Sequence, residues 1–199
     1  MGYRDQLVVT GKINDVGAYT RTNVPESFRM GIELQGGVRA AKWLNVTGNV
    51  TLSRNRIKNF TEYYDDYDDG GQKSIQHGNT DIAFSPAITG AANVSFYPVK
   101  DFEIGLLGKY VSRQYLDNTS NEARSLNPYY VQNARAGYTL RDMVFREAVI
   151  LLQVNNVFDK KFEPNGYTYS YQSGGALVTE NYYFPMAGVN FMLGVNIKF

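Results

Sequence analysis

The chain has 199 residues, a formal net charge of +1, no cysteine and one histidine. This length suits one ordinary domain, and the balanced charge gives no electrostatic signature for nucleic acid. The lack of cysteine excludes disulfides, thiolate catalysis and cysteine metal sites. The composition includes 16 tyrosines and 11 phenylalanines, and tyrosine suits the boundary between hydrocarbon and water.

Apolar and polar residues alternate in most of the chain, which is typical of strands with one apolar face. We predict eight such segments, in chain order: residues 4–13, 27–40, 43–59, 82–97, 102–114, 129–140, 149–154 and 186–199. No run of eighteen apolar residues exists, so the sequence predicts no transmembrane helix.

The last segment shows the alternation most clearly. Every second residue from Val189 to Phe199 is apolar, and mostly polar residues or glycine fill the positions between them. The chain offers almost no helix to cover so many apolar faces, so we expect lipid to cover them. Residues 149–154 are apolar at every position but one, so the pattern does not indicate which of them face lipid and which face the other side of the sheet.

The connections between these segments are of two kinds. Short turns at Ala41-Lys42, Val99-Lys100 and Arg141-Asp142 alternate with long polar loops over residues 60–80, 116–128 and 159–185. Outer-membrane barrels have short periplasmic turns and longer extracellular loops. The sequence therefore predicts an all-β fold, an antiparallel transmembrane β-barrel.

Short motifs in order along the chain resemble those of TonB-dependent outer-membrane receptors. They are Gln6–Gly11 with Asn14–Gly17, Ser27–Leu34, Asn155–Asp159 with Lys160–Phe162, and Phe184–Phe191, in which Val189 replaces the usual arginine of the family. The ending Gly194–Phe199 resembles the insertion signal of outer-membrane barrels. In that signal Gly194, Ile197 and Phe199 are the positions that the assembly machinery would read.

The resemblance implies a barrel of about 22 strands, of which residues 1–199 would be the C-terminal portion, about eight strands, with the plug domain absent. No signal peptide pattern precedes the first strand. The implied function is energy-coupled uptake of a scarce nutrient across the bacterial outer membrane, such as a siderophore, another metal chelate or a cofactor. No enzymatic activity is expected.

The same resemblance implies the partners of the chain. They are outer-membrane lipid, the barrel-assembly machinery at the C-terminal strand, the remaining strands and plug of the parent receptor, and TonB through that plug. We expect no bound cofactor and no nucleic acid.

Tyrosines in the long loops are the candidate substrate contacts, because aromatic rings suit flat apolar or sugar faces. They are Tyr63, Tyr64 and Tyr67 in the first long loop, and Tyr167, Tyr169, Tyr171, Tyr182 and Tyr183 in the last. The alternative is that they are girdle or loop-packing residues. The acidic run Glu62–Gly71 suggests calcium, but it lacks the ordered spacing of a calcium loop, which favours a solvated loop tip. His77 is expected to be an ordinary loop histidine.

Two other classes of protein stay open. A complete small barrel, an adhesin or passive pore, would also have about eight strands, and a barrel enzyme would need a catalytic constellation that the sequence does not show. Charges on the polar face argue against a small closed barrel, whose lumen is just wide enough for side chains. They are Arg29, Glu33, Arg39, Glu103, Lys109, Arg113 and Arg135.

Overall fold

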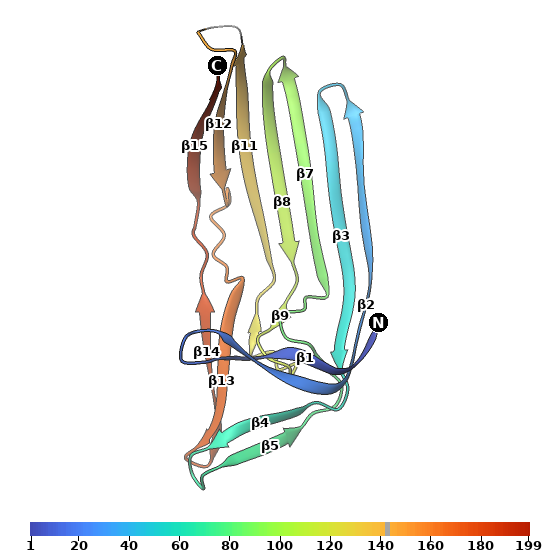
Figure 1. Ribbon diagram of the computed structural model, residues 1–199, viewed down its shortest axis with the longest axis vertical. Coiled ribbons are helices and arrows are strands. Elements are labelled where there is room, and N and C mark those ends of the chain that lie inside the picture. The colour runs from blue at the N-terminus through green and yellow to red at the C-terminus, as the bar shows by residue number, and fades with distance from the viewer. Residues whose placement is uncertain (142–143) are drawn as a thin grey trace.

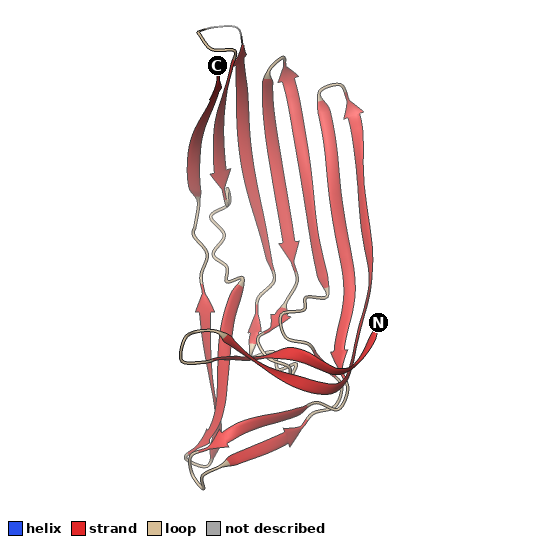
Figure 2. Cartoon of the chain, in the orientation of Figure 1, coloured by secondary structure: helices blue, strands red, loops and turns tan. Residues whose placement is uncertain are grey.

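The computed structural model describes residues 1–141 and 144–199. Every regular element in these ranges is a strand (Figure 2). The strands are β1 (Gly2–Ile13), β2 (Tyr19–Ala41), β3 (Leu44–Ile57), β4 (Thr61–Asp66), β5 (Gln72–Gln76), β6 (Thr80–Asp81), β7 (Ile88–Val99), β8 (Phe102–Val111), β9 (Gln114–Tyr115), β10 (Ser125–Leu126), β11 (Tyr129–Arg141), β12 (Glu147–Asn155), β13 (Asn165–Ser173), β14 (Ala176–Phe184) and β15 (Asn190–Lys198). No helix in the described ranges is long and apolar enough to cross a membrane.

The eight predicted strands form one antiparallel sheet, in the order β1-β2-β3-β7-β8-β11-β12-β15 (Figure 1). This confirms the predicted fold class. Several boundaries differ from the sequence prediction, and the two largest differences are at the starts of strands. Strand β2 starts at Tyr19, earlier than expected, and β7 starts at Ile88 rather than at residue 82. Pro86 lies in the segment before β7, and proline has no N–H to donate to a strand ladder.

The register of the sheet aligns the apolar residues into continuous rows across its strands. One row runs through Val38, Val46, Val94, Leu106, Ala134, Val154 and Phe191, and the next through Leu44, Phe96, Ile104, Ala136, Leu152 and Leu193. The pairing of Leu152 with both Ala136 and Leu193 therefore settles the facing of residues 149–154, which the period left ambiguous.

The opposite face of the sheet is largely polar. Its pairs place Asn45, Ser95, Gly105, Arg135 and Gln153 in one row. Arg135 forms an ion pair with Glu103 at 2.7 Å and lies over Gly105, where a Cβ atom would come within 2.8 Å of its Nε. Arg113 is an exception to the predicted face, because β8 ends at Val111.

Turns and loops separate to opposite ends of the sheet (Figure 1). The turns at Ala41-Lys42 and Val99-Lys100 lie at the end near the C-terminus, as predicted. The predicted turn at Arg141-Asp142 includes Asp142, which lies outside the described residues. The long connections gather at the other end.

The long connections contain further strands that the sequence analysis did not predict. They contain the hairpins β4–β5 and β13–β14 and the short pair β9–β10. These connections pack with β1 and the start of β2 into one body at this end of the sheet, which we call the cap. It comprises β1, residues 19–28 of β2 and residues 58–87, 112–128 and 156–189. Strand β13 alternates tyrosine with threonine and serine over Tyr167–Tyr171, a period of two that indicates a strand and that the sequence prediction missed.

The hydrophobic core of the molecule lies in the cap. Strand β2 pairs with β1 over its first part and with β3 over its second, and the β1–β2 hairpin crosses the end of the sheet (Figure 1). This bend brings Val8 and Val24 onto Ile57 and Ile82, each at most 4% exposed, with Phe60 packed beside them. The cap is therefore a packed body.

The sheet has two free edges in the described chain. Strand β1 pairs only with the first part of β2 and β15 only with β12, so the outer edges of Met30–Ala41 and β15 are free and the sheet does not close into a barrel. In hydrocarbon an unpaired backbone group costs several kcal/mol. These two edges therefore require partner strands in a membrane.

We expect the isolated chain to fail as a closed barrel for this reason. Refolded alone in detergent, it should give no heat-resistant monomer on a denaturing gel, and the amides of Asn190–Lys198 that face away from β12 should exchange rapidly. Slow exchange along the outer edges of both Met30–Ala41 and β15 in a monomer would contradict this prediction.

Candidate functional site

Two long connections that are distant in sequence form one small sheet in the cap. Strand β13 pairs in parallel with β4, with Tyr171 opposite Asp65 and Gln172 opposite Asp66, which gives the order β14-β13-β4-β5. The Tyr67 and Tyr171 rings lie 5.3 Å apart. The structure therefore joins the two loops that carry the predicted tyrosines.

Four aromatic rings form a cluster on β13 and β14. Tyr167 stacks on Tyr182 with ring centroids 4.8 Å apart, and it also contacts the rings of Tyr169 and Phe184. Because Tyr167 and Tyr182 are directly paired across the strands, the register itself sets this stack.

One carboxylate orients two of the tyrosine hydroxyls. Tyr171 and Tyr182 donate to Glu180 at 2.8 and 2.6 Å. These hydrogen bonds, that of Tyr182 first, lower the pKa of Glu180, and they raise the pKa of both tyrosines. The ionised acceptor thus holds both hydroxyls in fixed directions near the exposed surface.

The predicted tyrosines differ in exposure. Tyr63 and Tyr67 are 60% and 69% exposed, whereas Tyr64 is buried at 7%. Tyr169 donates its hydroxyl to the carbonyl of Ile13 at 2.7 Å, which ties β13 to β1. Tyr183 is 43% exposed and lies opposite Gly166. Tyr64 and Tyr169 therefore have packing roles.

The acidic run of the first long loop holds the cap together. Lys73 binds Asp66 at 2.6 Å, and this contact is the main cause of the lowered pKa of Asp66. Asp68 accepts hydrogen bonds from the amides of Gly174 and Gly175 at 2.7 and 2.8 Å, which joins the turn after β4 to the turn after β13. Among the described residues, no group of three or more acidic or histidine side chains is arranged to hold a metal ion.

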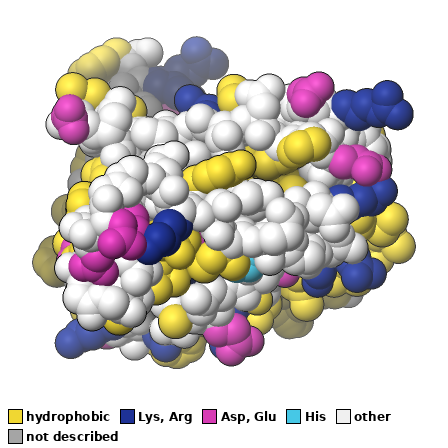
Figure 3. Space-filling view, turned by 90° about the horizontal axis from the view of Figure 1, so that it is seen from below, with side chains coloured by type: hydrophobic (Ala, Val, Ile, Leu, Met, Phe, Trp, Pro, Cys, Tyr) yellow, Lys and Arg dark blue, Asp and Glu magenta, His cyan; other side chains and the backbone are white. Residues whose placement is uncertain are grey.

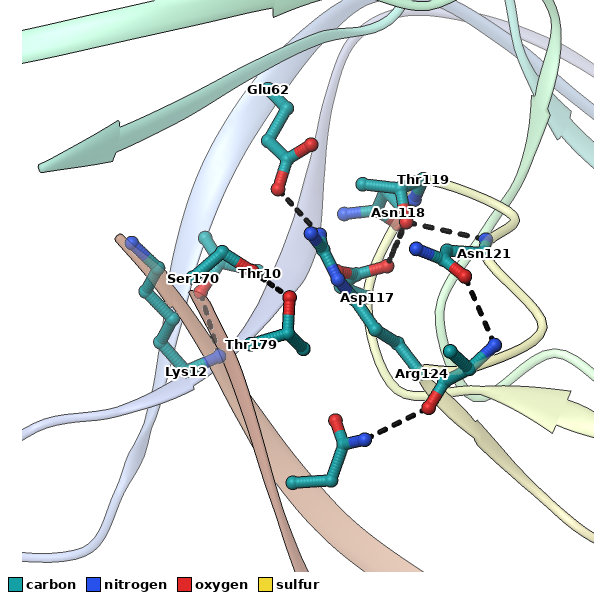
Figure 4. A network of polar contacts seen from close by, with 12 residues as sticks. Thr10, Lys12, Glu62, Asp117, Asn118, Thr119, Asn121, Arg124, Ser170 and Thr179 are labelled. Carbon is teal, nitrogen blue, oxygen red and sulfur yellow. Dashed lines mark hydrogen bonds and ion pairs between the residues drawn. The ribbon is translucent and has the colours of Figure 1, made fainter. Parts of the chain in front are cut away.

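A buried ion cluster links the first long loop to the segment between β9 and β10 (Figure 4). Arg124, 2% exposed, contacts Glu62 at 2.5 Å and Asp117 at 3.0 Å through the same nitrogen. The second oxygen of Glu62 lies 2.9 Å from Nε2 of His77. Burial opposes the charge of Arg124, but its two carboxylate partners outweigh it and raise the pKa.

Sequence analysis missed this cluster. Residues 116–128 contain isolated apolar residues, of which Leu116 and Leu126 are almost fully buried. Their spacing is not regular, so it predicts neither a strand nor a helix. Nothing in the spacing of Glu62, Asp117 and Arg124 predicts their contact, which depends on how the connections pack.

A cavity of about 420 Å³ lies between the β1–β2 hairpin, the start of β4, residues 117–119 and β13. Hydroxyl and amide side chains dominate its lining, and of the predicted tyrosines only Tyr63 reaches it. Seen from this end, hydrophobic side chains run across the middle of the surface between uncharged ones (Figure 3).

The fold and its two-faced sheet define a β-barrel wall with a cap at one end. A family model described as TonB dependent receptor-like, beta-barrel, matches residues 3–157. The chain therefore belongs to this family, as its motifs predicted. No curated protein matches the sequence of the chain.

Solved structures agree with this assignment. The siderophore receptor PiuA from Acinetobacter baumannii matches with a TM-score of 0.68 and 19% identity, over 100% of this chain and 25% of that chain. The ferric-catecholate import receptor Fiu from E. coli gives 0.62 and 20%, over 100% and 24%. The copper transporter OprC gives 0.63 and 16%, over 100% and 28%.

At these identities the likeness concerns the fold. The chain spans about a quarter of the length of these structures.

Proposed function

We propose that the chain is part of a bacterial outer-membrane receptor for energy-coupled uptake of a scarce nutrient. The observation that supports this most is the packed cap, which connections distant in sequence build at one end of a two-faced barrel wall. A passive wall would not need such a body, whereas a receptor needs an ordered surface to bind a dilute ligand.

In this proposal residues 1–199 are the C-terminal portion of a larger barrel of about 22 strands. The free outer edges of Met30–Ala41 in β2 and of β15 support it, because they would pair with the remaining strands of the parent. The plug of that parent would provide the contact with TonB, and lipid would cover the apolar rows.

The nutrient that we propose is a siderophore, another metal chelate or a cofactor. The proteins of similar fold are a siderophore receptor, a ferric-catecholate import receptor and a copper transporter. The fold alone therefore does not determine which nutrient is transported. The exposed rings of Tyr67 and Tyr182, with the hydroxyl of Tyr171 oriented by Glu180, would contact a flat aromatic chelate.

Two alternatives receive less support. A complete small barrel would pair its first and last strands, whereas β1 and β15 are unpaired with each other. A barrel enzyme finds no support among the similar structures, which are two receptors and a transporter.

Uptake of radiolabelled ferric chelates by cells that rely on the full-length receptor tests the proposal. Energy-coupled uptake should disappear when the receptor gene is deleted and also when the inner-membrane energy source is dissipated. Uptake that persists without this energy source would indicate a passive pore and would contradict the proposal.

We expect the double substitution Tyr67→Ala and Tyr182→Ala to lower uptake at limiting chelate about tenfold or more, since stacking aromatic anchors dominate binding energies. Tyr138→Ala is the matched control, because Tyr138 is exposed at 45% on the apolar face of the wall beside Phe102. If the double substitution and Tyr138→Ala lower uptake equally, the tyrosines of the cap are not part of the substrate site.

Deleting Phe199 should strongly lower the amount of receptor in the outer membrane without changing the uptake per receptor molecule. We assign Gly194, Ile197 and Phe199 to the insertion signal, and Phe199 is 95% exposed at the end of the chain, where it has no part in the cap. Quantitative surface labelling measures the effect, and normal surface levels would contradict this assignment.

A further inference from the structure

The cavity in the cap has a polar lining that the uptake proposal does not use. Threonine and serine hydroxyls come from three sides, with Thr10, Thr20 and Thr22 on the hairpin, Thr119 before β10, and Thr168 and Ser170 on β13. A few hundred Å³ is the size of a small-ligand pocket. The lining is therefore suited to a ligand that is rich in oxygen.

One hydroxyl in this lining is buried without a partner. Thr168 is 2% exposed, and within the described residues its Oγ1 has no hydrogen bond. A buried hydroxyl without a partner is costly, so native proteins rarely retain one without a reason. Rotation of the Thr168 side chain about χ1 would turn its hydroxyl toward the cavity that this residue lines, where a ligand oxygen would provide the missing partner.

The charges around the cavity balance. Lys12 and Arg124 are positive, and Glu62 and Asp117 are negative. Figure 4 shows Lys12 toward the left of the view and the ion cluster of the other three to its right. Each carboxylate oxygen of Glu62 and Asp117 already has a partner. An ionised ligand would leave an unbalanced charge in a partly buried site, which is unfavourable.

We propose that this cavity binds a neutral saccharide unit. Its hydroxyl and amide groups match the hydroxyls of a sugar ring, while Phe60 and Pro25 in the lining offer an apolar surface for the C–H face of the ring. The site lies apart from the exposed tyrosines of β14, and it does not depend on transport.

The test measures the equilibrium binding of three sugar probes to the full-length receptor purified in detergent. The three probes have the same pyranose ring and differ in charge. Methyl glucoside is neutral, glucuronate is negative and glucosamine is positive. We expect saturable binding of the neutral probe and at least tenfold weaker binding of the two charged probes. Preference for a charged probe, or no saturable binding of the neutral one, would overturn the proposal.

Thr168→Val tests the site itself, because it removes the hydroxyl and keeps the shape. The affinity for methyl glucoside should fall about five- to tenfold, as expected for one lost hydrogen bond. The melting temperature of the free receptor should not fall, since an unpaired buried hydroxyl is removed. Thr47→Val on the polar face of β3 is the control and should bind normally.

Thr22→Val on the opposite wall of the cavity provides a second variant. It should also weaken binding, and it keeps the test informative if Thr168→Val fails to fold. Unchanged affinity in both folded variants would overturn the assignment of the cavity.

Competition identifies the source of the sugar. Displacement of the bound probe by a dissolved oligosaccharide indicates a soluble ligand, and displacement by a solubilised glycolipid indicates the sugar head of an outer-leaflet lipid. Either outcome supports the site. Failure of both to compete would overturn it.

Discussion

The substitution Arg124→Met is expected to open the cap locally, at a cost of about 3–5 kcal/mol, because removing one member of a buried ion group leaves uncompensated charge. Glu62 and Asp117 would keep their negative charges with 10% and 9% of their side chains exposed. Methionine is long and unbranched and fills much of the space of arginine, so the loss would come mainly from charge.

Hydrogen exchange on the full-length receptor measures this opening. The amides of residues 116–126 should exchange about two to three orders of magnitude faster, because local opening free energies set exchange protection, while the wall strands should be unaffected. Arg113→Met is the matched control, since its ion pair with Glu122 at 2.7 Å is exposed and exposed pairs contribute at most about 1 kcal/mol.

A triple variant separates charge from packing. Adding Glu62→Gln and Asp117→Asn to Arg124→Met removes the unbalanced charges and should restore much of the protection. Protection that stays low in the triple variant would show that the shape of Arg124, rather than its charge, stabilises the cap.

The substitution Val94→Arg should cost roughly 2–4 kcal/mol in the membrane, because a charge on the lipid face near the bilayer midplane is penalised by this amount in barrels. Val94 lies about halfway along β7, between Val46 and Leu106 in an apolar row. These apolar neighbours offer the arginine no opposite charge and no hydrogen-bond acceptor that would offset the cost of placing its charge in lipid.

The preceding residue offers a matched control. Asn93→Arg places the same side chain on the polar face, between Thr47 and Leu107, and it should cost less than about 1 kcal/mol. Denaturant unfolding of the receptor in lipid vesicles measures both values. If Asn93→Arg is the costlier of the two, the assignment of the faces is reversed.

A related pair tests the last strand. Val195→Arg should be costly and Asn196→Ser nearly silent, because Val195 pairs with Ile150 and Asn196 with Val149 on opposite faces of β15. Surface levels of the receptor measure both changes, and equal tolerance would contradict the alternation in the C-terminal segment.

The strands of the wall could be predicted because the pattern that defines each one lies within its own segment of the sequence. A strand in a lipid-facing sheet needs an apolar residue at every second position, and this period is visible in segments such as Leu44–Leu52 without knowledge of neighbouring strands. Register and pairing then follow from short turns such as Ala41-Lys42. The one ambiguous segment, residues 149–154, needed its neighbours Ala136 and Leu193 to be oriented.

The cap could be predicted only in part. Long polar segments and their tyrosines were visible, but the contacts between them were not. The alternation of tyrosine with threonine and serine in β13 indicates a strand but not its partner. The parallel pairing of Tyr171 with Asp65 joins residues whose spacing in the sequence carries no signal. The contacts of Arg124 with Glu62 and Asp117 likewise arise from tertiary packing.

The shared strand pairing of the first and last long connections constrains how the surface of this receptor can be exchanged with that of a relative. Asp68 binds the amides of Gly174 and Gly175, and β4 runs alongside β13. A chimera that transplants residues 61–76 alone would lose both contacts and leave β13 paired with β14 alone. Grafting of ligand specificity therefore requires that residues 61–76 and 165–184 be transferred together.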